Sequence, residues 1–311
     1  MLENIEDLST LRLEGQEDIE IKLNDESYIL AQAKSVENSS TDFRNVRSNL
    51  KKSLESLSEA ANRVGKANRL IVITNSPNPI NEDESRSLFY GHAHRSYSSL
   101  PQSTQKIIDE YLSHLDNALH PTSLSIQVLP FETDDDKERY KEVMNVISDF
   151  LSRFDFPIDG LRPKLHEIWS YSVFKNGTRQ NEELRLTKKD IIWPIIVCVT
   201  DKKHIGREES VLATIDDGEY DVLIRKYEDI INSCTERFDF VTSVISDFHT
   251  DGYSGREAIP SFINERWKDY LDEFEICTID IDLKAKLIKV ILYIILKKRF
   301  DINDIKQKVK L

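Results

Sequence analysis

The sequence predicts a mixed α/β core over residues 1–133, followed by a mostly α-helical module over residues 134–311. Three features of the first part support an α/β core. Residues 14–35 hold two short runs in which polar and apolar side chains alternate, as in paired strands. Residues 41–64 carry apolar side chains at helical spacing, and residues 69–75 hold a continuous apolar run typical of a buried parallel strand. A mixed sheet flanked by helices accounts for all three features.

The composition suits a folded protein with long regular elements. Of 311 residues, 39% are hydrophobic and 31% are charged, which is enough to build an apolar core beneath a well-solvated surface. Only nine glycines and nine prolines are present, which favours long elements over tight turns. The most apolar run, residues 290–296, is too short and too closely flanked by lysines to span a bilayer, so we expect a buried helix and no membrane association. The three cysteines lack metal-ligand spacing and indicate free thiols in a cytoplasmic protein: Cys198, Cys234 and Cys277.

The hairpin within residues 14–35 is the element around which the first part is organised. Its two strands are joined by residues 24–27, which have turn composition. Successive side chains on a strand point to opposite faces, so Gln32 and Lys34 stand on one face of the second strand. Asp18 points away from the apolar face of the first strand. If the two polar faces coincide, a carboxylate, an amide oxygen and an ammonium converge at one end of the hairpin.

The helix expected over residues 41–64 begins at a capping residue, either Thr41 or Asp42. Its buried stripe consists of apolar side chains three or four residues apart: Phe43, Val46, Leu50, Leu54, Leu57 and Ala61. Four basic side chains lie off this stripe: Arg44, Arg47, Lys51 and Lys52. They form either a solvated helix face or a set of contacts to a nucleic-acid backbone, which would give affinity without sequence choice.

The rest of the first part adds one more strand to the same sheet, over residues 124–131. Residues 81–103 are predicted to be a polar surface loop. The pair His92 and His94 within it has no acidic or cysteine partner at a suitable spacing, so a metal site is the weaker interpretation. An amphipathic helix is expected over residues 104–119.

The sequence of the second part predicts helices and contains no motif for a chemical reaction. The expected helices cover residues 137–154, 161–173, 219–232, 238–248, 259–274 and 283–300, with an apolar segment at 191–199 that holds Pro194. The sequence contains no phosphate-cradling glycine-rich loop, no nucleophile elbow and no Cys/His zinc set. We therefore expect a module for assembly or sensing.

The convergence of Asp18, Gln32 and Lys34 suits metal-dependent cleavage of phosphodiesters. A carboxylate and a neutral oxygen bind a hard divalent cation such as Mg²⁺, which polarises the phosphate and helps to generate hydroxide. A nearby lysine positions or deprotonates the attacking water, or stabilises the developing charge. The alternative is a solvated hairpin with an isolated lysine.

On these residues the chain resembles the PD-(D/E)xK nuclease superfamily, and most closely the Mrr-like double-stranded DNA endonuclease domains of CBASS and Lamassu-type systems. The resemblance covers residues 11–80 and rests on Asp18 in one strand, the run from Gln32 to Lys34 in the next, the charged helix and the closing strand. It implies a restriction-endonuclease-like core. It also implies that Asp18, Gln32 and the Ala33 carbonyl bind Mg²⁺ or Mn²⁺, with Lys34 as the catalytic lysine.

The same resemblance implies a metal-dependent DNA endonuclease that acts as an effector of bacterial antiphage defence. The expected partners are double-stranded DNA, further copies of the chain, and an ATPase or nucleotide-signalling subunit that releases the activity. One departure supports an alternative. The family usually places a helix with an acidic residue before the first strand, and here that helix is at most the short stretch 2–8. The alternative is a catalytically degenerate nuclease-fold subunit that serves as an assembly protein of a defence complex.

The charge distribution permits a nucleic-acid partner without requiring one. The net charge is −13, but residues 31–75 carry +4 and residues 283–311 carry +7, whereas residues 76–282 carry −17. Charges farther apart than a Debye length are largely screened, so a local basic surface attracts phosphate even on an acidic protein.

Overall fold

The chain divides into two compact units in the structure, which is a computed structural model. The first unit joins residues 1–151 to residues 162–188, and the second joins residues 152–161 to residues 189–311. The first unit therefore extends past residue 133, where the sequence places the end of the α/β core. The structure describes residues 1–13, 18–37, 39, 41–129, 136–154, 160–178, 185–200, 222–223, 237–255, 257–274 and 280–311.

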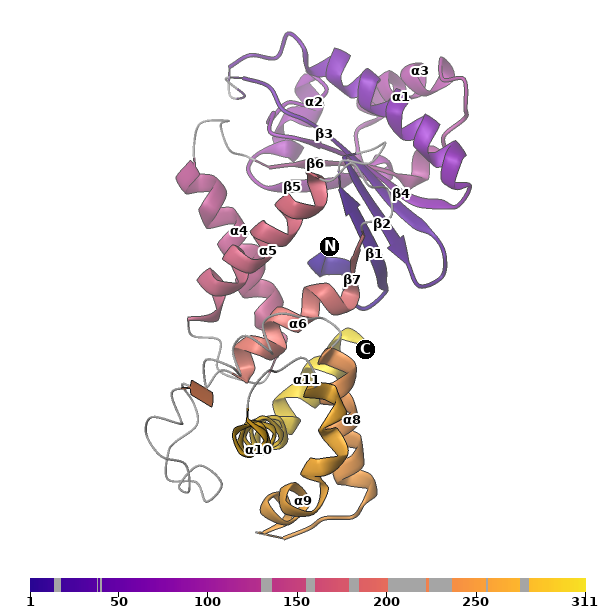
Figure 1. Cartoon of the computed structure of the whole chain (residues 1–311). Coiled ribbons are helices and arrows are strands. Elements are labelled where there is room, and N and C mark those ends of the chain that lie inside the picture. The colour runs from indigo at the N-terminus through magenta and orange to yellow at the C-terminus, as the bar shows by residue number, and fades with distance from the viewer. Residues whose placement is uncertain are drawn as a thin grey trace. The chain divides into compact units, whose positions relative to one another are not determined.

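A seven-stranded mixed sheet forms the centre of the first unit (Figure 1). Its strand order is β5-β6-β4-β3-β2-β1-β7. The first three strands form an antiparallel meander, β3, β4 and β6 run parallel, and β5 and β7 lie antiparallel at the two edges. The strands are β1 (Leu8–Leu13), β2 (Ile19–Leu23), β3 (Tyr28–Lys34), β4 (Ala67–Thr74), β5 (Ala93–Ser96), β6 (Leu124–Val128) and β7 (Leu186–Thr187). The predicted α/β core with a mixed sheet is confirmed, and β7 is a strand that the sequence does not predict.

Helix α1 (Val46–Val64) is the crossover between the parallel strands β3 and β4. It begins later than predicted, because Asn45 is the N-cap residue and neither of the two predicted capping residues caps it. Asp42 instead accepts hydrogen bonds from the backbone nitrogen and the guanidinium of Arg44. Phe43 consequently precedes the helix, and the rest of the predicted stripe is buried or partly buried.

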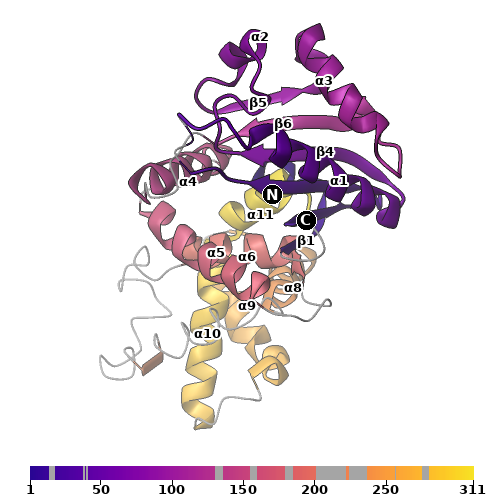
Figure 2. The same cartoon turned by 90° about the horizontal axis from the view of Figure 1, so that it is seen from above.

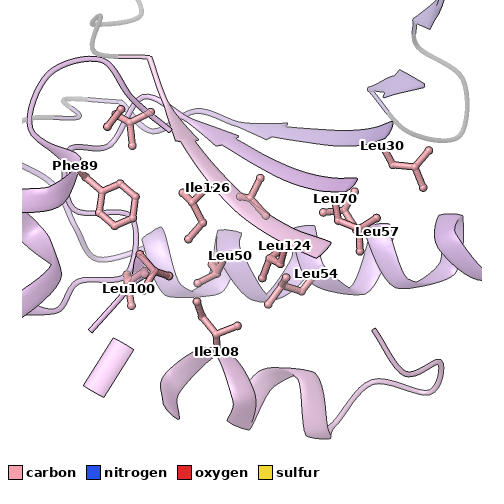
Figure 3. Close-up of a cluster of buried hydrophobic side chains, with 14 of the residues drawn as sticks. Leu30, Leu50, Leu54, Leu57, Leu70, Phe89, Leu100, Ile108, Leu124 and Ile126 are labelled. Atoms are coloured by element: carbon pink, nitrogen blue, oxygen red, sulfur yellow. The ribbon is translucent and has the colours of Figure 1, made fainter. Parts of the chain in front are cut away.

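A hydrophobic core fills the space between α1 and the sheet (Figure 3). Leu54 and Leu57 of α1 are fully buried and face Leu70 and Leu124 on the two neighbouring parallel strands. Ile108 of α3 (Gln102–Ser113) enters the same cluster. This packing fixes α1 over β3 and β4. It therefore also fixes the beginning of α1, which lies near the carboxyl ends of these strands.

Residues 81–103 are not the surface loop that the sequence predicts. They form helix α2 (Asp83–Arg86), two short 3-10 turns and the edge strand β5. The physical reason is that several apolar side chains of this serine-rich stretch are buried, among them Phe89 at 0% and Ala93 at 2% exposure, whereas Tyr90 is exposed. Figure 2 shows β5, β6 and β4 in succession, with α2 and α3 near the β5 edge.

Two further helices, α4 (Asp136–Leu151) and α5 (Leu161–Gly177), lie between β6 and β7 in the chain. The rings of Phe150 and Trp169 lie 6.2 Å apart between them. Helix α5 runs beyond the predicted end at Val173, because Asn176 packs inward and accepts a hydrogen bond from the backbone of β1 at 3.1 Å. This bond ties α5 to the first strand of the sheet.

The described part of the second unit is helical, as the sequence predicts. Its helices are α6, which begins at the end of the first unit (Lys188–Val199), α8 (Arg237–Thr250), α9 (Ala258–Arg266), α10 (Ile281–Lys297) and α11 (Arg299–Val309). The run 290–296 is at most 2% exposed, which confirms it as a buried helix segment within α10. The single helix predicted over 283–300 is wrong, because Lys298 separates α10 from α11. The helix predicted over 259–274 ends at Arg266 and continues as 3-10 turns.

Several predictions concern residues whose structure is only partly described. The helix predicted over residues 219–232 lies outside the described residues except for 222–223. Cys198 is buried and belongs to no disulfide, as expected, whereas Cys234 and Cys277 lie outside the described residues. None of the helices in the described ranges combines the length and the apolar character needed to cross a bilayer.

Candidate functional site

The candidate site lies where the beginning of β2 meets the end of β3. The first residue of β2 pairs with Ala31, which places the preceding Asp18 opposite Gln32. Leu30 of β3 belongs to the core beneath α1, and Gln32 and Lys34 follow it at intervals of two residues. Asp18, Gln32 and Lys34 therefore share the face of the sheet that α1 covers.

The carboxylate of Asp18 is held against the end of β3 by two hydrogen bonds. Its Oδ2 accepts from Nε2 of Gln32 at 2.7 Å and from the backbone nitrogen of Ala33 at 2.6 Å. Gln32 is only 4% exposed, so its amide is fixed by its surroundings. Hydrogen bonds to an ionised acceptor are stronger than neutral ones and orient the carboxylate. Neither Oδ1 of Asp18 nor Oε1 of Gln32 takes part in these two bonds.

A second acid on the same face, Glu20, has a structural role. It is two residues from Asp18 and 8% exposed. Its carboxylate accepts from the guanidinium of Arg63 on α1 at 3.0 Å and lies 3.9 Å from that of Arg12 on β1. The two arginines balance its charge in a buried position, so Glu20 links three elements and is not a candidate metal ligand.

Lys34 stands at the carboxyl end of β3, where it lines a small pocket with Asn49 of α1, Thr74 of β4 and Pro79. Its ammonium makes no ion pair within the part of the chain that the structure describes. The sequence gives no sign of a role for Asn49 or Thr74, because a polar residue beside an apolar helical stripe or at a strand end is common on protein surfaces.

The four basic side chains proposed for DNA contact have different surroundings. Arg47 donates from Nε to the carbonyl of Ile80 at 2.8 Å and from a terminal nitrogen to that of Asn81 at 3.1 Å, so it holds a loop. Arg44 is highly exposed but paired with Asp42, and its hydrogen bonds hold the pKa of this carboxyl at about 2. The two lysines are exposed, and one of them, Lys51, lies 3.9 Å from Glu55.

The oxygen atoms of the site are hard donors of the kind that Mg²⁺ prefers. They comprise one carboxylate from Asp18, the amide oxygen of Gln32 and the carbonyl of Ala33. Mg²⁺ commonly binds through one or two carboxylates and keeps several waters, so this set fits the ion with few protein ligands. Within the described ranges, no three His, Cys, Asp or Glu side chains form a metal-binding group. His94 instead lies 2.9 Å from the hydroxyl of Ser125.

Comparison of the chain with protein-family models, curated proteins and solved structures found no match. The fold and the site define the class of protein only as a mixed α/β unit with a helical C-terminal part. The resemblance to the nuclease superfamily therefore remains a prediction.

Proposed function

We propose that the first unit is a metal-dependent DNA endonuclease domain with a restriction-endonuclease-like core, and that the chain is an effector of bacterial antiphage defence. One observation carries the proposal: the carboxylate of Asp18 is held beside Gln32, on the face of the sheet that also bears Lys34. The antiparallel meander, the crossover helix α1 and the parallel strand β4 follow in the order that the superfamily resemblance implies.

Each residue of the site has a distinct role in this proposal. Asp18, with the oxygens of Gln32 and Ala33, would hold Mg²⁺ or Mn²⁺, which supplies a polarising charge for the phosphate and an acidified water. Lys34 donates hydrogen bonds to the attacking water or to a non-bridging phosphate oxygen. Its positive charge stabilises the negative charge that develops as water adds to phosphorus.

The exposed lysines of α1, Lys51 and Lys52, are the better candidates for contacts to the DNA backbone. Such contacts give affinity that falls with salt and carries no sequence preference. Arg47 is the weakest of the four predicted contacts, because the loop carbonyls of Ile80 and Asn81 already occupy its guanidinium.

Cleavage of a supercoiled plasmid by the purified full chain with Mg²⁺ or Mn²⁺ tests the proposal. We expect Lys34→Ala and Asp18→Asn each to lower the rate by about 100-fold or more. Lys66→Ala, an exposed lysine paired with Asp25 at the opposite end of β4, is the matched control for Lys34. Asp25→Asn, an exposed carboxylate in the turn of the same hairpin, is the matched control for Asp18. Equal nicking by wild type and Lys34→Ala would remove Lys34 from the mechanism.

A second candidate function, a non-catalytic assembly subunit with the same fold, is favoured by a separate observation. Helices α4 and α5 line an apolar groove of about 470 Å³ in the first unit. Val143, Val146 and Phe174 on these helices are between 43% and 67% exposed. Clustered exposed apolar side chains are typical of protein contact surfaces. A chain that cleaves no DNA when mixed with its defence partners, yet binds them through this groove, would support this candidate.

A further inference from the structure

The end of β3 is held by an unusual partner, the side chain of Asn75. The backbone pairing of β3 with β4 ends at Lys34 and Thr74. Two residues farther along, the backbone nitrogen of Val36 donates to Oδ1 of Asn75 at 2.9 Å, and Nδ2 of Asn75 donates to the carbonyl of Val36 at 2.9 Å. The side-chain amide therefore takes the place of a strand's peptide group and continues the pairing past Lys34.

Asn75 is itself fixed in place. It is only 4% exposed, and it is the first residue of a loop held by several hydrogen bonds. The nitrogen of Ser76 donates to the hydroxyl of Thr74, and that of Asn78 donates to the hydroxyl of Ser76. Arg47 of α1 closes the loop at its far end through the carbonyls of residues 80 and 81. The rigid side-chain amide of Asn75 therefore acts as a bracket, meaning a fixed pair of hydrogen bonds at a strand end that would otherwise open locally.

We propose that Asn75 is a positioning residue for Lys34, the lysine on which the proposed function depends. The backbone at Lys34 is held by its own pairing with Thr74 and, two residues farther along, by the hydrogen bonds of Val36 to Asn75. Together these contacts set the direction in which the long side chain of Lys34 leaves the sheet. Asn75 acts through the backbone and does not touch the reacting atoms.

The buried hydrophobic cluster between α1 and the sheet does not include Asn75 or Val36, and Val36 is only partly buried. Removing the amide therefore exposes the Val36 peptide groups to water and leaves the core intact. We expect a local loosening of residues 33–37 with little change in the thermal midpoint.

The test uses the full chain with Asn75→Ala and, as a matched control, Asn68→Ala. Asn68 lies on the same strand and donates to the hydroxyl of Ser27 at the opposite end. The rate of hydrogen exchange in the peptide covering residues 33–37 measures how firmly the hydrogen bonds of Asn75 hold this part of the backbone. The rate at which Lys34 is acylated by a small reagent, relative to exposed Lys52, reports the position of its ammonium. Neither measurement requires nuclease activity.

For Asn75→Ala we expect faster exchange at residues 33–37 and a several-fold change in Lys34 labelling, with neither effect in Asn68→Ala. In the plasmid assay we expect kcat to fall by about 100-fold with KM nearly unchanged, because misplacement of a catalytic group by about 1 Å has this effect. Unchanged exchange or unchanged Lys34 labelling in Asn75→Ala would overturn the proposal, as would full kcat despite loosened exchange. A wild type that cleaves nothing would refute the proposed function alone, and the labelling result would still decide the role of Asn75.

Discussion

Replacing Glu20 with alanine is the perturbation that best tests how α1 is anchored to the sheet. Among the described residues, the carboxylate of Glu20 is the acidic partner of the Arg63 guanidinium, at 3.0 Å. It also lies 3.9 Å from Arg12. The substitution leaves two guanidinium groups beneath α1 without this carboxylate, so the cost depends on how well they reach water.

The exposed fractions set the magnitude. Two unit charges 3.0 Å apart attract by about 5 kcal/mol at an effective dielectric constant of about 20, before desolvation is subtracted. Breaking a fully buried pair costs about 3–5 kcal/mol, but the Arg63 side chain is 36% exposed and can rehydrate. Arg12, at 17%, is less able to do so. We therefore expect Glu20→Ala to lower the free energy of unfolding of the first unit by about 2–3 kcal/mol.

A double-mutant cycle with Arg63→Ala separates the pair from other effects. Hydrogen exchange at peptides of α1 and β2 is the suitable assay, because the chain has two units and need not unfold in a single transition. We expect Arg63→Ala alone to cost about 1 kcal/mol and the double mutant to lose about 1 kcal/mol less than the sum of the two single mutants. Additive losses would refute the idea that this ion pair anchors the helix.

Three further predictions concern the core, an alkaline titration and the site. Leu57→Ala should lower the free energy of unfolding by about 3 kcal/mol, measured by hydrogen exchange at β3 and β4, because the side chain is fully buried. Burial and a hydrogen bond to Asp109 raise the pKa of Tyr97 to about 12. The unfolded chain therefore ionises first, and stability should fall as the pH rises from about 10 to about 12. Tyr97→Phe should flatten that fall in thermal unfolding followed by circular dichroism, and an unchanged slope would contradict it. Without metal, Gln32→Glu should lower the thermal midpoint, because it places a second carboxylate against Asp18. Addition of Mn²⁺ should then raise the midpoint of this variant more than that of the wild type.

The strands that could be predicted are those whose order of polar and apolar side chains has only one structural interpretation. The alternation before and after the turn fixed the hairpin, and the continuous apolar run of β4 indicated a strand with both faces covered. Strand parity was sufficient to place Gln32 and Lys34 on one face. Only the register of β2 against β3 brings Asp18 to that face, and a shift of one residue would have sent it to the other.

The parts that could not be predicted depend on contacts distant in the sequence. The two-residue strand β7 has no pattern of its own and exists because it pairs with β1. The role of Arg47 depends on carbonyl groups more than thirty residues away, and exposure statistics for arginine give no sign of it. The bracket formed by Asn75 is of the same kind, since the sequence shows only an asparagine in a stretch typical of a turn.

The identity of residue 32 links the two candidate functions. A glutamate there would place two carboxylates about 3 Å apart, an arrangement that needs a proton or a cation. Gln32 instead donates to Oδ2 of Asp18, so these two side chains attract each other without a proton or a cation. With glutamine at position 32, Asp18 is the single carboxylate available to a divalent ion, and the ion then depends on other ligands. Mg²⁺ commonly takes these from the phosphates of its substrate. If the first unit is the proposed nuclease, we therefore expect metal and DNA to bind cooperatively, so that the apparent metal affinity rises with DNA concentration. A nuclease built in this way stays idle until DNA is delivered to it, whereas a degenerate subunit would bind Mn²⁺ equally weakly with and without DNA.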